Sequence, residues 1–327
     1  MKVNDRVYGQ INITEPVLLE LIKSKPLQRL KEINQAGASK YVTVNKTVSR
    51  YEHSLGVMIL LKILGASLEE QIAGLLHDVP HTAFSHVVDF VFTNNKYDHE
   101  FHEKFHAPII NNSDIPKILE KFAYKLDRIL DEHNFLLLER ELPDLCADRI
   151  DYALRDRVAM KYNSTQVPVY VKNFTVQNQE IIFKDREIAK AFAEDYLDMD
   201  YRSWSHPLEV ACYQLLANAL KLALEHNIIT QDDLFQTDDV VYNKLKESKD
   251  KEVLDYLDKL NPKLKIIQDP DDYDFQARNK LRYVDPKFIS RQGSIQHVTE
   301  AWPEFKEVIA KHKDWIEAGN YIKIINY

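Results

Sequence analysis

Apolar residues recur at helical spacing over most of the chain. Residues 14–34 open with Thr-Glu-Pro, a common helix start, and continue with leucine and isoleucine on one face, while Pro26 divides the stretch into two short helices. A second apolar stripe covers residues 52–64 and stops at Gly65. The first part of the chain is therefore predicted to be helical.

The next predicted helix leads into a polar cluster. Ser67 and Glu70 have the spacing of a capping box, so the helix is predicted to begin there. It must end just before Pro80, because proline lacks an amide hydrogen and restricts the residue that precedes it. His77 and Asp78 are thus expected in the last helical turn, held by a rigid element beside a loop.

The remaining chain keeps the helical pattern with one interruption. Alternating apolar and polar residues over 167–185 predict a small β-hairpin. Further helical segments are predicted at residues 114–134, 141–157 and 186–226. We therefore predict a mainly α fold, with a helical core over residues 1–225 that includes the hairpin and a peripheral helical extension over residues 226–327.

Composition narrows the class of protein. Of 327 residues, 45% are hydrophobic and only 7 are glycine, which is enough apolar material for a large core and favours helices. A formal net charge of −8 disfavours general nucleic-acid binding, which needs clustered Lys and Arg. Cys146 and Cys212 have no cysteine neighbours, which disfavours both a zinc-ribbon site and a secreted disulfide scaffold. The N-terminus has no apolar signal-peptide region, and the longest apolar run, residues 57–66, is too short to cross a bilayer. We predict a cytoplasmic protein without membrane partners.

Three polar clusters contain the residue types of a metal-dependent site. They are RYEHSLG at 50–56, HDVPH at 77–81 with FSH shortly after it, and DRIDYALRD at 148–156. Imidazole nitrogens and carboxylate oxygens together suit Mn, Fe, Co, Ni or Zn. A set of two His and two Asp leaves coordination positions open for water and a phosphate oxygen. Asp148, Tyr152 and Asp156 are spaced i, i+4, i+8, so they share one helical face beside such a site.

The order His53, then His77-Asp78, then Asp148 resembles the HD superfamily of metal-dependent phosphohydrolases. More narrowly, RYEHSLGV, IAGLLHDVPHTAFSH and ADRIDYALRD resemble its deoxynucleoside triphosphate triphosphohydrolase branch, and the similarity extends from YGQINITEP near the N-terminus to the helix around 186–220. An adjacent His-Asp pair alone is weak evidence, but the full set in order within matching flanks is specific. The resemblance implies a helical HD-domain bundle.

The same resemblance assigns a role to each matching residue. It implies one divalent transition metal (Mn, Fe, Ni, Co or Zn) held by His53, His77, Asp78 and Asp148, with Mg²⁺ a further candidate alongside the substrate phosphates. It implies catalytic roles for His81, His86, His99 and Glu100. It implies substrate contacts from Arg50, Arg149, Tyr152 and Asp156, the last to a sugar hydroxyl.

Simpler interpretations stay open for several of these residues. His99 lies in HEFHEKFH, a spacing that fits an exposed helix face equally well. Arg149 and Arg155 lie among aspartates and fit ion pairs on a helix surface. Tyr152 and Trp204 fit packing roles.

The substrate side departs from the family pattern. Where members have a stacking tyrosine and a phosphate-binding lysine, this chain has Trp204 and Pro207, and Tyr196 is nearest to a further family arginine. These departures fall on substrate-contacting positions and not on the metal ligands, so they leave phosphoester hydrolysis better supported than a dNTP substrate. From the resemblance, the leading hypothesis is hydrolysis of a dNTP to a deoxynucleoside and triphosphate. The alternatives are a nucleotide phosphatase or phosphodiesterase of the same fold, and a catalytically weak nucleotide sensor. A homo-oligomer is expected by resemblance alone.

Overall fold

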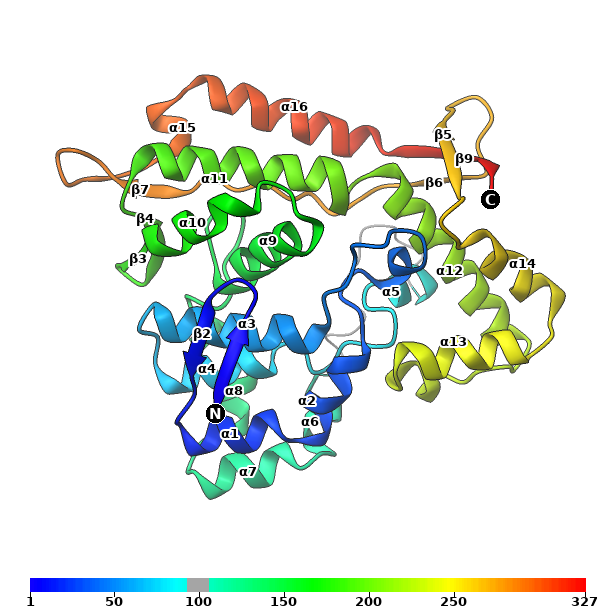
Figure 1. Ribbon diagram of the computed structural model, residues 1–327, viewed down its shortest axis with the longest axis horizontal. Coiled ribbons are helices and arrows are strands. Elements are labelled where there is room, and N and C mark those ends of the chain that lie inside the picture. Colours follow the sequence, from blue (N-terminus) through cyan, green and yellow to red (C-terminus); the bar gives the residue numbers. More distant parts are fainter. Residues whose placement is uncertain (93–105) are drawn as a thin grey trace.

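The computed structural model describes residues 1–92 and 106–327 and confirms a mainly helical fold with small sheets (Figure 1). The helices that surround the predicted site are α3 (Arg50–Ile63), α4 (Leu68–Leu76), α9 (Ala147–Met160), α11 (Arg186–Met199) and α12 (Pro207–Glu225). Shorter helices pack around them: α1 (Pro16–Ile22), α2 (Lys25–Arg29), α5 (Val87–Phe92), α6 (His106–Asn111), α7 (Ile115–Lys121) and α8 (Leu126–Leu130). Within the described ranges, no helix is both long enough and apolar enough to span a bilayer.

Local hydrogen bonds fix the start of α3 and α4. Ser49 caps α3 with a full capping box, in which its hydroxyl accepts from the Glu52 amide and the Glu52 carboxylate accepts from the Ser49 amide, both at 3.2 Å. Ser67 caps α4 in the predicted way. The other half of the predicted box is missing, because the Glu70 carboxylate turns inward and accepts from the amides of Leu137 and Leu138. A tertiary contact thus replaces the local one.

The predicted hairpin is shorter than its sequence pattern. Strands β3 (Phe174–Gln177) and β4 (Glu180–Phe183) pair antiparallel, and the left-handed φ angles of Asn178 and Gln179 form the turn between them. Residues 167–173 instead form helix α10 (Val167–Asn173), which has proline in its first turn. The alternation in VPVYV therefore belongs to a short helix and not to a strand.

The C-terminal region contains strands as well as the predicted helices. Strand β7 (Lys287–Ile289) pairs parallel with β4 of the hairpin, and β8 (Ile295–His297) extends the same sheet. A separate sheet has the order β5-β9-β6, from β5 (Lys265–Gln268), β6 (Phe275–Ala277) and β9 (Asn320–Asn326). The other elements are the N-terminal hairpin β1 (Lys2–Asp5) and β2 (Gly9–Asn12), and helices α13 (Asp238–Glu247), α14 (Lys251–Lys259), α15 (Val298–Ala301) and α16 (Glu304–Ala318).

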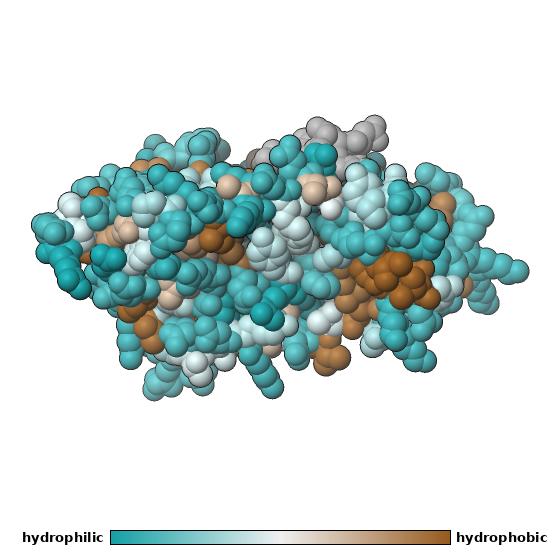
Figure 2. All heavy atoms as spheres, turned by 90° about the horizontal axis from the view of Figure 1, so that it is seen from above, coloured by the Kyte–Doolittle hydropathy of each residue, from teal (hydrophilic) through white to brown (hydrophobic). Residues whose placement is uncertain are grey.

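Helix α16 joins the C-terminal region to the core. Its Phe305 and Ile309 belong to the same buried apolar cluster as Ala189 and Phe192 of α11. The opposite side of α16 is exposed and charged, and the view from above in Figure 2 shows a mainly hydrophilic surface there. The apolar face of α16 therefore packs into the same core as α11 and holds the C-terminal region against it.

The crossing of α3 and α9 depends on a glycine. A Cβ at Gly56 would lie 1.8 Å from Nη2 of Arg155 and 2.2 Å from Oδ1 of Asp151. Only a residue without a side chain lets these two charged groups pass so close to α3. Gly56 thus makes room for a buried ion pair between the helices.

We expect Gly56→Ala to lower the free energy of unfolding by about 3 kcal/mol, because the added methyl must displace a buried, hydrogen-bonded charge pair. Urea unfolding followed by circular dichroism measures this. Gly74→Ala is the matched control, since its Cβ would meet the movable end of the Leu61 side chain, and it should change stability by about 1 kcal/mol or less. Equal effects of the two substitutions would contradict the prediction.

Candidate metal centre and active site

Three helices bring the predicted metal donors together. His53 comes from the first turn of α3, His77 follows the last turn of α4, and Asp148 lies in the first turn of α9. One donor atom from each lies within 4.8 Å of the others. Asp148 Oδ1 is 2.8 Å from His53 Nε2 and 3.5 Å from His77 Nε2. Three of the four predicted ligands thus lie together at helix ends.

The tautomers of both histidines suit a metal. His77 Nδ1 donates to the Gly74 carbonyl at 2.8 Å, so Nε2 has the free lone pair. That buried Nε2 has no hydrogen-bond partner among the described residues, and an unpartnered imidazole nitrogen that faces a carboxylate is suited to coordinate a cation. His53 Nδ1 is likewise engaged, at 2.8 Å from Asp151 Oδ2, which points its Nε2 at Asp148. The N and O donors fit a borderline divalent metal.

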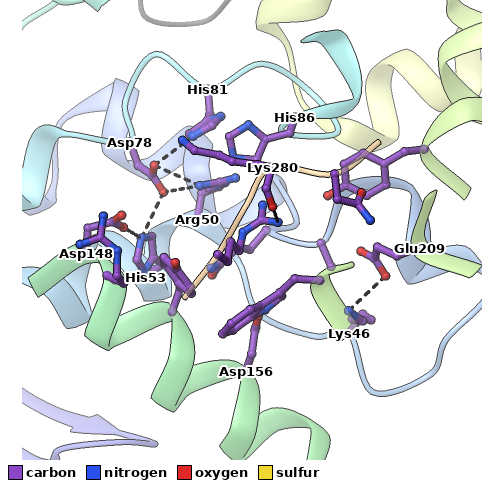
Figure 3. Close-up of a pocket in the computed structure, with 18 of the residues that line it drawn as sticks. Lys46, Arg50, His53, Asp78, His81, His86, Asp148, Asp156, Glu209 and Lys280 are labelled. Carbon is purple, nitrogen blue, oxygen red and sulfur yellow. Dashed lines mark hydrogen bonds and ion pairs between the residues drawn. The ribbon is translucent and has the colours of Figure 1, made fainter. Parts of the chain in front are cut away.

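Asp78, the fourth predicted ligand, lies at the edge of this group. Its Oδ2 is 3.9 Å from His53 Nε2 and its Oδ1 is 3.5 Å from His77 Nε2. Arg50 Nη1 donates to both Asp78 oxygens at 3.0 and 3.1 Å, and His81 Nε2 lies 3.1 Å from Oδ1. Asp78 therefore links the metal donors to the predicted phosphate-contacting and catalytic side chains (Figure 3).

A buried network of charged side chains contacts His53 at Nδ1, the ring nitrogen that faces away from Asp148. Asp151 accepts from both Nε and Nη2 of Arg155 at 2.8 Å, and Arg155 Nη1 lies 3.0 Å from Asp5 Oδ2 at the end of β1. The side chains of Asp151 and Arg155 are fully buried. A surface ion pair, the simpler interpretation that the sequence left open for Arg155, is therefore wrong, because this ion pair is buried. An i, i+4 Asp-Arg pair has the same pattern on either face of a helix, and the Gly at position 56 was the available signal.

The electrostatics of the donors favour a cation between them. Burial lowers the pKa of His53, but hydrogen bonds to Asp148 and Asp151 outweigh this and raise that pKa to about 10. Burial raises the pKa of Asp148, yet the hydrogen bond from His53 and the nearby His77 imidazole bring the net pKa below the usual range. The carboxylates thus favour positive charge between the three side chains. A divalent ion there would supply that charge and would displace any proton on a coordinating nitrogen.

The predicted catalytic histidines lie beside Asp78. The rings of His81 and His86 pack edge to face with centroids 4.9 Å apart, and His86 Nδ1 lies 3.1 Å from Asp89 Oδ2. Between them, Ser85 has a left-handed φ of 53° and its hydroxyl accepts from Arg50 Nε at 2.9 Å. His99 and Glu100 lie outside the described residues.

The four predicted substrate residues line one cavity with the metal donors, but each already has a protein partner. Arg50 donates to Asp78, as described above. Arg149 donates to the Asp144 carbonyl at 2.6 Å and to Glu139 at 3.3 Å. The Tyr152 hydroxyl is hydrogen bonded to that of Tyr196. Asp156 accepts from the Trp204 indole at 2.8 Å. Trp204 and Tyr196, at the positions where the chain departs from the family, thus hold the side chains of Asp156 and Tyr152 in place.

The cavity is about 440 Å³ in volume, within the range of small-molecule sites. Lys46 and Glu209, 3.2 Å apart, lie at the opposite end from His53 and Asp148 (Figure 3). Lys280 and Arg282 also line it. Sequence analysis singled out none of these four residues. Lys46 comes from a loop, Glu209 from the first turn of α12, and Lys280 and Arg282 from the C-terminal region, and only the tertiary fold brings them to one cavity.

Comparisons with known proteins agree with this geometry. The family model described as the HD domain matches residues 50–156. The uncharacterized protein YdhJ of Bacillus subtilis is 42% identical over 99% of each chain. The metal-dependent phosphohydrolase cns2 of Cordyceps militaris is 32% identical over 73% of this chain and 71% of that protein. The human deoxynucleoside triphosphate triphosphohydrolase SAMHD1 is 33% identical over 37% of this chain and 22% of its own length.

Solved structures share the fold over nearly the whole chain. A hypothetical protein from Aquifex aeolicus superposes with a TM-score of 0.69 at 21% identity, covering 100% of this chain and 94% of that one. A phosphohydrolase from Bacteroides thetaiotaomicron superposes with a TM-score of 0.66 at 20% identity, covering 92% and 94%.

We expect Asp151→Asn to weaken metal binding by about 10- to 100-fold, because His53 loses the carboxylate that fixes its ring and tautomer. Isothermal titration of the metal-free protein with Mn²⁺ measures the affinity. Asp156→Asn makes the same chemical change two turns apart from Asp148 on α9, where it contacts Trp204, and should leave the affinity unchanged. Equal affinities for Asp151→Asn and the unmodified protein would rule out the positioning role of Asp151.

Metal affinity should also fall as pH falls from 9 to 6. A His53 whose pKa is near 10 holds a proton throughout this range and must release it to coordinate. Each displaced proton lowers the apparent affinity by about tenfold per pH unit. Titrations in buffers with different ionisation enthalpies count the protons released. An affinity independent of pH would show that His53 binds no metal.

Proposed function

The chain belongs to the HD-domain metal-dependent phosphohydrolases, and from that premise we propose that it hydrolyses deoxynucleoside triphosphates to a deoxynucleoside and inorganic triphosphate. The observation that supports this most is the placement of His53, His77 and Asp148 at one end of a nucleotide-sized cavity that Arg50 and Arg149 also line. Such cations are suited to phosphate oxygens.

The metal would supply Lewis acidity toward water and a phosphoryl oxygen. The chain itself supplies the rest. Arg50 neutralises phosphate charge next to Asp78, and its guanidinium is held in place by Ser85. His81 and His86 are positioned to take a proton from the attacking water or give one to the leaving oxygen, since both line the cavity beside Asp78.

The opposite end of the cavity would hold the nucleoside. Tyr152 and Trp204 present aromatic surface there, with rings in an edge-to-face contact at 5.1 Å. Asp156 can accept from a sugar hydroxyl while it keeps its bond to the Trp204 indole, because a carboxylate has lone pairs for several donors. The Lys46–Glu209 pair closes this end with both a donor and an acceptor.

A second candidate is a phosphomonoesterase or phosphodiesterase that acts on a nucleotide. It is favoured by the engagement of Arg149 with Glu139 and the Asp144 carbonyl, which leaves fewer donors for a long phosphate chain. A sensor without turnover is disfavoured, since all four predicted metal ligands are present in the sequence and three of them, His53, His77 and Asp148, lie together.

Product identity separates these candidates. Metal-loaded protein is incubated with a panel of dNTPs and nucleoside monophosphates, and the products are followed by ³¹P NMR. We expect inorganic triphosphate from dNTPs, because attack at the α-phosphorus leaves the three phosphates together. His77→Ala, which removes a metal donor, should abolish both metal binding and turnover. Orthophosphate as the sole phosphorus product would overturn the triphosphohydrolase proposal in favour of a phosphatase.

A further inference from the structure

The segment between β6 and β7 crosses the cavity. Residues 279–282 of this segment line the cavity together with the metal donors. Figure 3 shows Lys280 on this stretch of chain, between Asp78 and Glu209 in that view. The C-terminal region thus forms part of the candidate active site and lies directly against the substrate space.

The backbone of this segment is fixed on both sides. The Asn279 side chain donates to the Ser205 carbonyl at 3.0 Å. His312 Nε2 of α16 donates to the Arg282 carbonyl at 2.9 Å. Lys280 therefore projects from a stretch of backbone tethered at either end, and a side chain on such a support loses less entropy when it binds a ligand.

The cations around the cavity differ in how far they are already neutralised. Arg50 pairs with Asp78 at 3.0 Å and Lys46 with Glu209 at 3.2 Å. Arg282 has its nearest carboxylate, that of Asp200, at 3.9 Å. Lys280 forms no ion pair with any residue in the described ranges. The charges of these last two side chains are thus the most available to a ligand.

A polyphosphate substrate requires such charges. The metal centre and Arg50 can neutralise the reacting phosphate, but the other phosphates of a nucleoside triphosphate need further cationic donors. The residues that resemblance assigns to phosphate contact include Arg149, which already donates to Glu139 and to two backbone carbonyls. Position 207, where the family has a phosphate-binding lysine, is a proline.

We propose that Lys280 and Arg282 bind the phosphates that lie away from the reacting phosphorus, so that the C-terminal region supplies the cations that select a polyphosphate. This rests on the proposed triphosphate substrate. It assigns to the C-terminal region a direct role in substrate selection.

The test measures binding of inorganic tripolyphosphate and of orthophosphate to the metal-loaded, full-length protein by isothermal titration. Lys280→Ala should weaken tripolyphosphate binding by about 10- to 100-fold, the range for a charge-assisted hydrogen bond. Orthophosphate binding should change less than about threefold, because one phosphate fits at the metal end. Arg282→Lys, which keeps the charge but loses the planar fork, should give an intermediate loss.

Lys263→Ala is the control, since Lys263 is an exposed lysine of the same region that does not line the cavity, and it should bind both probes normally. Unchanged tripolyphosphate binding by Lys280→Ala would overturn the assignment, and so would an equal loss of both probes. These outcomes are independent of the products identified by ³¹P NMR, so a failure here is distinct from a failure of the proposed function.

Discussion

The candidate site depends on one chain of charges that runs from Asp148 through His53 and Asp151 to Arg155 and then Asp5. Asp148 is partly exposed, and the pairing of each member with the next makes the burial of the side chains of His53, Asp151, Arg155 and Asp5 tolerable. Removing one partner from such a pair leaves an uncompensated charge and costs about 3–5 kcal/mol. The chain joins α3, α9 and the N-terminal hairpin, so the position of the metal donors is tied to the relative position of these elements.

The grouping of His53, His77 and Asp148 could be predicted from the sequence because their order and flanking motifs are distinctive, whereas Asp78, predicted with them, lies at the edge of the group. The network behind His53 was not predictable in the same way. Asp151 and Arg155 are spaced like any surface ion pair, and only the approach of α3 at Gly56 shows that they are buried. The Glu70 carboxylate shows the same limitation, since its partners are amides far along the chain. Local sequence patterns thus identified the candidate metal donors better than the buried residues that hold those donors in position.

The side of the cavity that Tyr152, Asp156, Tyr196 and Trp204 form, here called the substrate wall, is organised differently from the metal end. Tyr152 with Tyr196 and Asp156 with Trp204 form hydrogen bonds to one another across α9, α11 and the π-helical turn Asp200–Trp204. These hydrogen bonds between its own side chains preorganise the substrate wall. A ligand that binds the same oxygen or nitrogen atoms must share or replace those hydrogen bonds. The departures from the family pattern therefore alter how the nucleoside end is recognised more than how a phosphoester is cleaved.

The parallel pairing of β4 with β7 at Phe183 and Phe288 has a consequence for dissecting the protein. A fragment that ended before β7 would leave the edge of β4 that faces away from β3 without a neighbouring strand, and such an open strand edge pairs readily with other chains. Phe288 would also leave the apolar cluster that it shares with Phe183 and Phe192. The segment matched by the HD family is therefore a poor choice of boundary for recombinant expression, since its surroundings form part of the same folding unit.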